Sequence, residues 1–210
     1  MILQGFDKKF CITTRTILLV IPYYNPWSWM NRQAFVYTAE ILSVLKERYS
    51  LPNDIPIVSS GLSMGGLAAM VWAKDIKPAP VACVLNCPVF DLAEMLARRQ
   101  HAIYRTLYSA FYSAHEDGTL EDAFKKVSPL HMIDEMPKID YYIFQCEDDD
   151  NVCKSTHSDP FVTEMRRRGH RVTYHTIPGR GHCDLPDDFQ KLFNQYIINA
   201  ISQGGKIICQ

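Results

Sequence analysis

Short apolar runs alternate with amphipathic helical patterns along this chain of 210 residues. Five apolar runs predict strands, at residues 17–21, 55–58, 81–85, 141–144 and 171–175. Apolar positions that share one helical face predict helices at residues 32–48, 64–73, 158–168 and 187–201. Strands that alternate with helices are typical of βαβ units, so we predict an α/β fold with a mostly parallel, doubly wound sheet.

Two segments need separate interpretation. Residues 17–21 are apolar at every position and end at Pro22, which predicts a strand buried on both faces. Residues 91–127 are rich in Tyr, Phe, Ala and Leu, show no strand pattern and contain one turn signal, at Asp117-Gly118. We predict a helical insertion there, either a cap over the strand ends or a long crossover, within a single domain spanning residues 1–210.

Composition limits the classes of partner and the compartment. The net charge is −1, from 22 basic and 23 acidic residues, which favours neither nucleic acid nor an anionic membrane as a partner. Seven cysteines have no even framework spacing, no secretory leader pattern opens the chain, and no apolar run is long enough to span a bilayer. We therefore predict a cytoplasmic protein with reduced thiols.

A G-x-S-x-G string occupies the junction between a predicted strand and a predicted helix, at Gly61-Leu62-Ser63-Met64-Gly65. In a nucleophile elbow, the serine sits on a strained turn, and small residues two positions before and after it let the strand and helix approach. The helix N-terminus beneath it favours a developing oxyanion. This context predicts Ser63 as a nucleophile and the N–H of Met64 as the first oxyanion donor.

A serine nucleophile needs a base, and histidine has the pKa for that task at neutral pH. Of the seven histidines, His182 lies in a glycine-rich loop between the last predicted strand and the last predicted helix. Loops at the carboxyl ends of parallel strands are where α/β sheets place their chemistry, so we predict His182 as the base. We expect His157 and His170 to be exposed and the remaining histidines to be structural or solvated.

The acid that orients the base follows the serine and precedes the histidine in this kind of fold. Four consecutive carboxylates at residues 147–150 follow the strand predicted at 141–144, and physical arguments alone do not choose among them. Asp91, after the preceding strand, is also open. Asp184 is too close in sequence to His182 to orient it easily, and we expect it to support the loop.

These motifs resemble those of the prolyl-oligopeptidase-like branch of the α/β hydrolases, which includes dipeptidyl peptidases and small bacterial esterases. The family's H-G-x-x-D-x-x-V acid strand corresponds to residues 145–152 and puts Asp149 in the acid position. Its S-P-x segment corresponds to Ser128-Pro129-Leu130, and its G-x-G-H loop to residues 179–182. The resemblance covers roughly residues 17–200 and implies an α/β-hydrolase fold with Ser63, Asp149 and His182 as the catalytic triad.

The sequence departs from that family in two places. Gln145-Cys146 replaces the His-Gly pair before the acid, which changes the polarity around the triad. The family usually has two or more strands and an H-G-G oxyanion loop before residues 17–21, so the resemblance implies a shortened amino end. Three alternatives remain for the second oxyanion donor. Residues 3–6 are a remnant of that loop, residues 23–25 supply the donor, or the chain is truncated and lacks the loop. Tyr24 is a candidate substrate-binding residue, as a hydroxyl donor or as part of an aromatic wall.

Metal and cofactor sites have no supporting motif. A cluster can be imagined from several scattered thiols and imidazoles, namely Cys146, Cys153, His157, His182 and Cys183. No C-x-x-C pair, HExxH helix or nucleotide-binding glycine motif supports it, and Cys83 and Cys87 fit a buried strand as small apolar side chains. We predict neither a metal nor a cofactor.

The combined prediction is a serine hydrolase that cleaves an ester or amide bond through an acyl-Ser63 intermediate. A carboxylesterase acting on small molecules is the leading interpretation. A prolyl-oligopeptidase-like peptidase acting on short peptides is the first alternative. The second is a non-catalytic member of the fold that serves as a binding module. The expected partner is a small ester or a short peptide, with no nucleic acid and no membrane.

Overall fold

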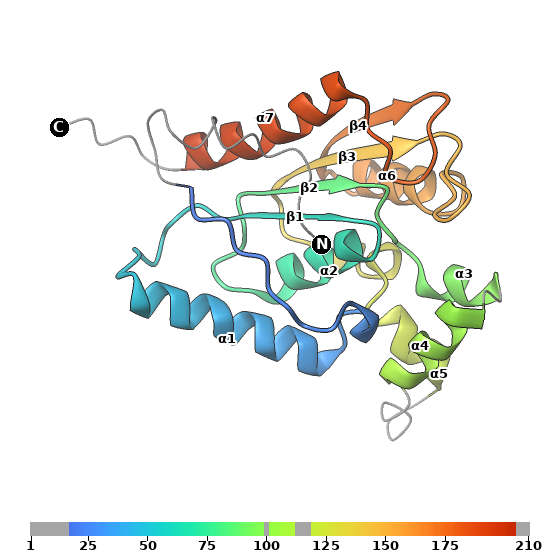
Figure 1. Cartoon of the computed structure of the whole chain (residues 1–210), viewed down its shortest axis with the longest axis horizontal. Coiled ribbons are helices and arrows are strands. Elements are labelled where there is room, and N and C mark those ends of the chain that lie inside the picture. Colours follow the sequence, from blue (N-terminus) through green and yellow to red (C-terminus); the bar gives the residue numbers. More distant parts are fainter. Residues whose placement is uncertain (1–16, 99–100, 112–118, 205–210) are drawn as a thin grey trace.

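A computed structural model describes residues 17–98, 101–111 and 119–204 (Figure 1). Four parallel strands form one sheet in the order β1-β2-β3-β4. Their bounds are Val58–Leu62 (β1), Ala82–Asn86 (β2), Asp140–Cys146 (β3) and Arg171–Ile177 (β4). The longer helices are α1 (Arg32–Arg48), α2 (Met64–Asp75), α6 (Ser158–Arg167) and α7 (Asp187–Gly204). Three short 3-10 helices are η2 (Pro26–Ser28), η4 (Pro129–His131) and η5 (Ile133–Glu135).

Helices cover both faces of the sheet, which confirms the doubly wound prediction (Figure 1). Helix α7 packs on one face, where Phe193 meets Val84 and Phe144. Helices α2 and α6 pack on the other, and α1 lies outside α2. Because β2 is covered on both sides, all five of its residues are buried, which explains its continuous apolar run.

The strand predicted at residues 55–58 lies three residues later, at Val58–Leu62. The ladder with β2 fixes these bounds, from Val58 opposite Ala82 to Leu62 opposite Asn86. The two serines inside the strand donate their hydroxyls to the backbone, Ser59 to Ala69 O (2.9 Å) and Ser60 to Val84 O (2.9 Å). Satisfied hydroxyls can be buried at little cost, so these serines extend the strand rather than end it.

The prediction of a buried strand at residues 17–21 is wrong. This segment forms no strand. Its side chains at residues 18–21 are exposed, from 42% at Val20 to 54% at Ile21, and Ile17 is half-buried. Within the described residues, β1 is an edge strand and pairs only with β2. A buried strand needs apolar side chains and also a neighbouring strand that pairs with its backbone groups. The apolar run shows the side chains but says nothing about the neighbouring strand.

The segment between β2 and β3 contains helices joined by loops in its described part. It contains α3 (Leu92–Ala97), α4 (His101–Phe111) and α5 (Leu120–Lys125), and its described part has no strand. These helices contact one another and lie beyond the ends toward which the strands point (Figure 1). The predicted turn at Asp117-Gly118 falls outside the described residues. No helix in the described parts of the chain is long and apolar enough to cross a membrane.

Candidate active site

Ser63 occupies the tight turn between β1 and α2. Its backbone has φ 53° and ψ −122°, a conformation that L-residues rarely adopt and that costs on the order of 1–3 kcal/mol. The surrounding backbone holds this turn in place, because Ser63 N donates to Asn86 O (3.0 Å) and Ser63 O accepts from Gly66 N (2.9 Å). The predicted nucleophile elbow is therefore present in the fold.

Two glycines allow this turn to pack closely. A Cβ on Gly61 would overlap the carbonyl oxygen of Gly65, and a Cβ on Gly66 would lie 2.6 Å from Cβ of Pro88. A Cβ on Gly65 would meet no atom within 4 Å. The expected need for a small residue is thus confirmed two positions before Ser63. On the helix side the need is three positions after the serine, rather than two.

The structure brings together the three side chains predicted as a triad. His182 Nε2 lies 2.9 Å from Ser63 Oγ, and His182 Nδ1 lies 2.8 Å from Asp149 Oδ2. The side chain of Asp149 is fully buried, whereas that of His182 retains 24% exposure. The other oxygen, Asp149 Oδ1, accepts from Asn151 N and Val152 N at 2.9 Å each. The carboxylate is thus held rigidly behind the imidazole.

The buried carboxylate and the imidazole reinforce each other's charged forms. Burial acts to raise the pKa of Asp149, but hydrogen bonds from His182 and from the Val152 N–H outweigh it and lower the pKa. Burial acts to lower the pKa of His182, but the hydrogen bond and negative charge of Asp149 outweigh it and raise the pKa. An imidazole in this position can gain a proton from Ser63 at reduced cost.

The other carboxylates considered as the orienting acid form no hydrogen bond with His182. Glu147, Asp148 and Asp150 are exposed. Asp91, the alternative acid, caps α3 and accepts from the N–H groups of Ala93 (2.8 Å) and Glu94 (3.4 Å). Only Asp149 among these carboxylates hydrogen-bonds His182.

Asp184 supports the histidine loop, as predicted. Its carboxylate accepts from Arg180 Nη1 at 3.0 Å, and its N–H donates to Gly181 O at 3.2 Å. Both contacts join a residue before His182 to Asp184 after it, and so hold the loop closed around the histidine.

Gln145, which replaces the family's histidine, is buried. It connects α6 to the loop at residues 147–157 that carries Asp149, called the acid loop below. Its Nε2 donates to Asp149 Oδ2 (3.3 Å) and to Val152 O (3.0 Å), and its Oε1 accepts from Ser158 Oγ (2.6 Å). The amide therefore contributes to holding the Asp149 carboxylate. The sequence showed the substitution but not these partners, which lie in the loop after β3 and at the start of α6.

Met64, the predicted oxyanion donor, and Tyr24, the candidate substrate-binding residue, have different surroundings. Met64 is the first residue of α2, where an N–H has no partner within the helix. Tyr24 is partly buried and lines a solvent-open hollow of about 510 Å³, together with Trp27 and Asn31. None of the triad residues lines that hollow. Residues 3–6, the other candidates for an oxyanion loop, lie outside the described residues.

Two thiols, those of Cys87 and Cys183, lie beside the base, and Cys146 contacts Cys87 through its backbone. Cys183 Sγ is 3.7 Å from His182 Nε2, and Cys87 Sγ accepts from Cys146 N at 3.4 Å. Hydrogen bonds from the thiols of Cys146 and Cys183 lower the pKa of Cys87, and the same contacts raise the pKa of both partners. Cys87 and Cys183 have left-handed backbones (φ 44° and 58°), as does Ser63. Cys83 and Cys87 are both fully buried in apolar clusters, as expected for small apolar side chains, and Cys87 has these polar contacts in addition.

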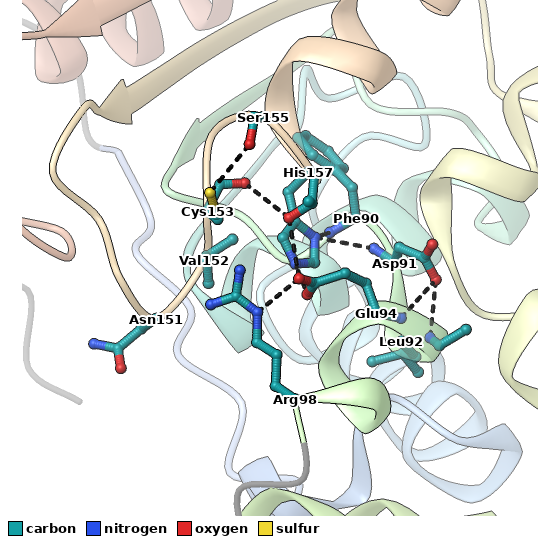
Figure 2. Close-up of polar contacts among 12 residues, drawn as sticks. Phe90, Asp91, Leu92, Glu94, Arg98, Asn151, Val152, Cys153, Ser155 and His157 are labelled. Carbon is teal, nitrogen blue, oxygen red and sulfur yellow. Dashed lines mark hydrogen bonds and ion pairs between the residues drawn. The ribbon is translucent and has the colours of Figure 1, made fainter.

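His157 anchors the insertion to the acid loop (Figure 2), so the prediction that it is exposed is wrong. Its side chain is fully buried, and Nδ1 accepts from Phe90 N (3.2 Å) and Asp91 N (3.3 Å). Nε2 lies 2.7 Å from Glu94 Oε2. Two N–H donors on Nδ1 indicate a neutral ring that donates from Nε2. Burial lowers the pKa of His157, and the charge of Glu94 offsets this only in part.

Helix α3 also reaches the acid loop directly. Arg98 Nε donates to Glu94 Oε1 (2.6 Å), and Arg98 Nη1 donates to the backbone oxygen of Asp150 (2.6 Å), next to Asp149.

His170 is also expected to be exposed from the sequence, but it is only 6% exposed, and its ring packs edge-on against Tyr141. The contacts of His157 and His170 come from segments far away in the sequence, so local sequence carries no signal for their burial.

A sequence profile described as "Prolyl oligopeptidase family" matches residues 38–195, three quarters of the chain. The chain belongs to the prolyl oligopeptidase family. No curated protein sequence matches it. The matched range includes the elbow, the acid loop and the histidine loop, in the order that the family resemblance implied.

Solved structures show the same α/β-hydrolase fold. A puromycin hydrolase is 17% identical, with a TM-score of 0.63, over 81% of this chain and 25% of its own. Dipeptidyl peptidase 4 of Porphyromonas gingivalis is 14% identical (TM-score 0.59), over 83% of this chain and 24% of its own. A thermophilic esterase of Thermogutta terrifontis is 21% identical (TM-score 0.54), over 81% and 65%. The chain spans about a quarter of the length of the puromycin hydrolase and of the dipeptidyl peptidase.

Proposed function

We propose that this chain carries the catalytic unit of a serine hydrolase that cleaves an ester or amide bond through an acyl-Ser63 intermediate. The observation that carries the proposal is the continuous hydrogen-bonded path from Ser63 Oγ through His182 to Asp149, at 2.9 and 2.8 Å. These are the distances needed for proton transfer between a nucleophile, a base and an orienting acid.

In the first half-reaction, Ser63 Oγ attacks the acyl carbon while His182 Nε2 takes its proton. The resulting imidazolium is stabilised by the buried Asp149 carboxylate. The oxyanion is bound by the N–H of Met64, at the positive end of α2, and by a second donor among residues not assigned. His182 then gives its proton to the leaving oxygen or nitrogen, and the acyl group remains on Ser63.

In the second half-reaction, water takes the place of the leaving group. His182 Nε2 accepts a proton from water, and the hydroxide equivalent attacks the acyl-Ser63 carbonyl. Collapse of the second oxyanion releases the acid, and His182 returns the proton to Ser63 Oγ. The enzyme is regenerated with its three side chains in their starting hydrogen bonds.

Reaction with a fluorophosphonate probe tests this proposal. The purified chain is incubated with the probe, and the labelled peptide is identified by mass spectrometry. Labelling of Ser63 that is lost in Ser63→Ala and strongly reduced in Asp149→Asn supports it. Folded protein that does not react, while a known serine hydrolase reacts alongside, contradicts it and favours the non-catalytic binding module.

A small ester is our leading proposal for the substrate, because the described carboxylates of the insertion already have structural partners. An aminopeptidase needs an acid to hold the substrate's amino end. Asp91 and Asp122 cap the starts of α3 and α5, Glu94 binds His157 and Arg98, and Glu121 pairs with Lys125. The family and the puromycin hydrolase neighbour favour amide or peptide cleavage as the second candidate.

The two candidates separate in a direct comparison of rates. Acetyl and butyryl esters of p-nitrophenol are assayed against a panel of aminoacyl-anilides, with Ser63→Ala as the blank. We expect ester turnover to be much faster, since an ester needs little help in protonating its leaving group. Anilide turnover that equals or exceeds ester turnover makes peptidase the leading function.

A further inference from the structure

We propose that Cys87, Cys183 and His182 form a binding site for one soft divalent metal ion, such as Zn²⁺ or Cd²⁺, and that occupancy of this site inhibits the hydrolase. Two thiol sulfurs and one imidazole nitrogen converge here, and all three donor atoms lie within 4.8 Å of one another. The binding part of this inference is independent of the proposed function, whereas the inhibition rests on it.

The donor set selects the class of metal. Thiolate sulfur and imidazole nitrogen favour zinc, cadmium and related soft or borderline ions over Mg²⁺ and Ca²⁺, which prefer oxygen. Two thiolates and one imidazole leave a fourth tetrahedral position open for water. Each thiol releases its proton to solvent on binding, so two thiolates neutralise the divalent charge and the occupied site is uncharged.

The spacing fits zinc without a large rearrangement. Zinc–sulfur and zinc–nitrogen bonds of about 2.3 and 2.0–2.1 Å at a tetrahedral angle put the two donors about 3.6 Å apart. Cys183 Sγ and His182 Nε2 are 3.7 Å apart. Cys183 and His182 are partly exposed and provide access from solvent, while Cys87 is buried beneath them.

The far side of the imidazole is already arranged as in many zinc sites. Metal-binding histidines commonly donate their second ring N–H to a carboxylate, which fixes the tautomer and the ring orientation. Asp149 Oδ2 accepts from His182 Nδ1 at 2.8 Å, so the lone pair available to a metal is on Nε2, the atom that faces Ser63 and Cys183. The acid that prepares His182 as a base thus also prepares it as a ligand.

The two uses of His182 exclude each other. Nε2 has one lone pair, which either accepts the Ser63 proton or binds the metal. Ser63 Oγ and Cys183 Sγ lie 2.9 and 3.7 Å from this same atom. Bound metal therefore removes the base while leaving Ser63 and the fold in place, and a chelator restores activity.

Metal binding is measured first without reference to activity. The full chain with Cys11, Cys153 and Cys209 replaced by serine serves as the parent, so that these three thiols cannot bind the probe. Zn²⁺ is titrated in competition with a chromophoric chelator, and zinc X-ray absorption spectroscopy reports the ligands. We expect one ion per chain, bound by two sulfurs and at least one nitrogen. Ligation by nitrogen and oxygen alone overturns the inference, as does the lack of saturable binding.

Substitutions then assign the site. Cys87→Ser and Cys183→Ser should each raise the dissociation constant for Zn²⁺ at least about 100-fold, since loss of a ligand exceeds the 10–100-fold effect of its supporting hydrogen bonds. Cys83→Ser is the matched control, because Cys83 is buried in the core away from the cluster, and it should bind as the parent does. Equal affinity in all variants overturns the assignment. Spectroscopy on the parent keeps the test valid even if a variant fails to fold.

Activity on p-nitrophenyl acetate is measured last, with and without Zn²⁺, Cd²⁺ and Mg²⁺. Zn²⁺ and Cd²⁺ should inhibit in step with occupancy, and Mg²⁺ should not. Zinc bound through two sulfurs in a chain that cleaves neither esters nor anilides contradicts the proposed function and leaves the metal site intact. Full ester turnover with the site occupied contradicts the inhibition, and ester turnover without zinc binding contradicts the site alone.

Discussion

At the scale of single residues, the site depends on a few atoms held by hydrogen bonds from different segments. Asp149 shows this most clearly, since one carboxylate oxygen binds His182 and the other binds the backbone of the acid loop. Its exposed neighbours Asp148 and Asp150 have the same chemistry but not the same position. The role of a carboxylate here is decided by its location rather than by its residue type.

Asp149→Asn should lower kcat on the order of 10⁴-fold, by analogy with the serine-protease acid, because the amide favours the wrong tautomer of His182. Asp148→Asn and Asp150→Asn are the matched controls and should change kcat by only a small factor. Steady-state rates on p-nitrophenyl acetate measure the difference. A crippled Asp91→Asn enzyme with an active Asp149→Asn enzyme contradicts this assignment.

The pH dependence of activity should reflect His182. The base must be neutral, and Asp149 raises its pKa, so kcat/KM should increase with pH through an apparent pKa above about 6.5. Rates are measured in metal-free buffer with a chelator present. In Asp149→Asn the raising interaction is lost, so the midpoint of any residual activity should move to lower pH. A flat profile between about pH 5 and 8 argues against histidine as the base.

At the scale of elements, the approach of α2 to the strand ends decides the geometry of the elbow. Gly66 faces Pro88, which follows β2, whereas Gly65 on the same helix faces open space. The two adjacent glycines therefore form an internal comparison. Close packing against Pro88 requires a glycine at position 66. At position 65 there is space for a side chain.

Gly66→Ala should lower the free energy of unfolding by about 1–3 kcal/mol, because the new methyl group overlaps the backbone and side chain of Pro88. Gly65→Ala should be neutral or stabilise by up to about 1 kcal/mol, since alanine favours the helix. Urea unfolding of both variants beside the parent chain measures the difference. Equal effects of the two substitutions contradict the packing argument.

The junction of α3 with the acid loop depends on His157 (Figure 2). His157→Ala should cost at least about 2 kcal/mol, because it leaves two backbone N–H groups and the Glu94 carboxylate without their buried partner. His131→Ala is the control, since its ring is partly exposed and lies 3.7 Å from Asp91 Oδ2. Urea unfolding of both variants at neutral pH measures the costs, and equal losses contradict the anchoring role.

The same junction should be sensitive to acid. The pKa of His157 is lower in the folded state than in the unfolded chain, where it is about 6.5, despite the facing carboxylates Asp91 and Glu94. The unfolded state therefore binds the proton more readily, and stability falls as the pH decreases below about 6.5. His157→Ala should lack this part of the loss, so its stability difference from the parent should shrink in acid.

At the scale of the whole molecule, two apolar clusters share one sheet. The larger lies on the side of α2 and α6, and the smaller is closed by α7. In the described part of the chain, α7 is the helix that covers this second face. Because β2 and β3 contribute side chains to both clusters, loss of either cluster should weaken the whole sheet and the strand ends that carry the site.

Phe193→Ala should lower the free energy of unfolding by about 3–5 kcal/mol, since the ring is 2% exposed and packs against Phe144 with centroids 5.5 Å apart. Lys191→Ala on the exposed side of α7 is the control, and it should stay within about 0.5 kcal/mol. Denaturant titrations followed by circular dichroism measure both. An unaffected Phe193→Ala variant means that α7 does not contribute to the stability of the sheet.

The sequence by itself determined the features that depend on neighbours along the chain. The alternation of apolar runs and helical patterns predicted every strand of the sheet and its four longer helices, with end errors of a few residues. The strand–serine–helix order located the elbow at Ser63, and the glycine-rich loop located His182. The choice of Asp149 as the acid required the family resemblance, because local physical arguments do not distinguish among four adjacent carboxylates.

Tertiary structure decided which distant segments meet. It left residues 17–21 outside the sheet, because pairing needs a partner strand that an apolar run does not specify. It also buried His157 and gathered Cys87, Cys183 and His182. Ser63 and His182 are 119 positions apart, and Asn86 and Cys183 are 97 apart, yet both pairs touch. Strand order and register set such contacts, because they place the carboxyl ends of neighbouring strands at one edge, and a residue's near neighbours in sequence do not encode them.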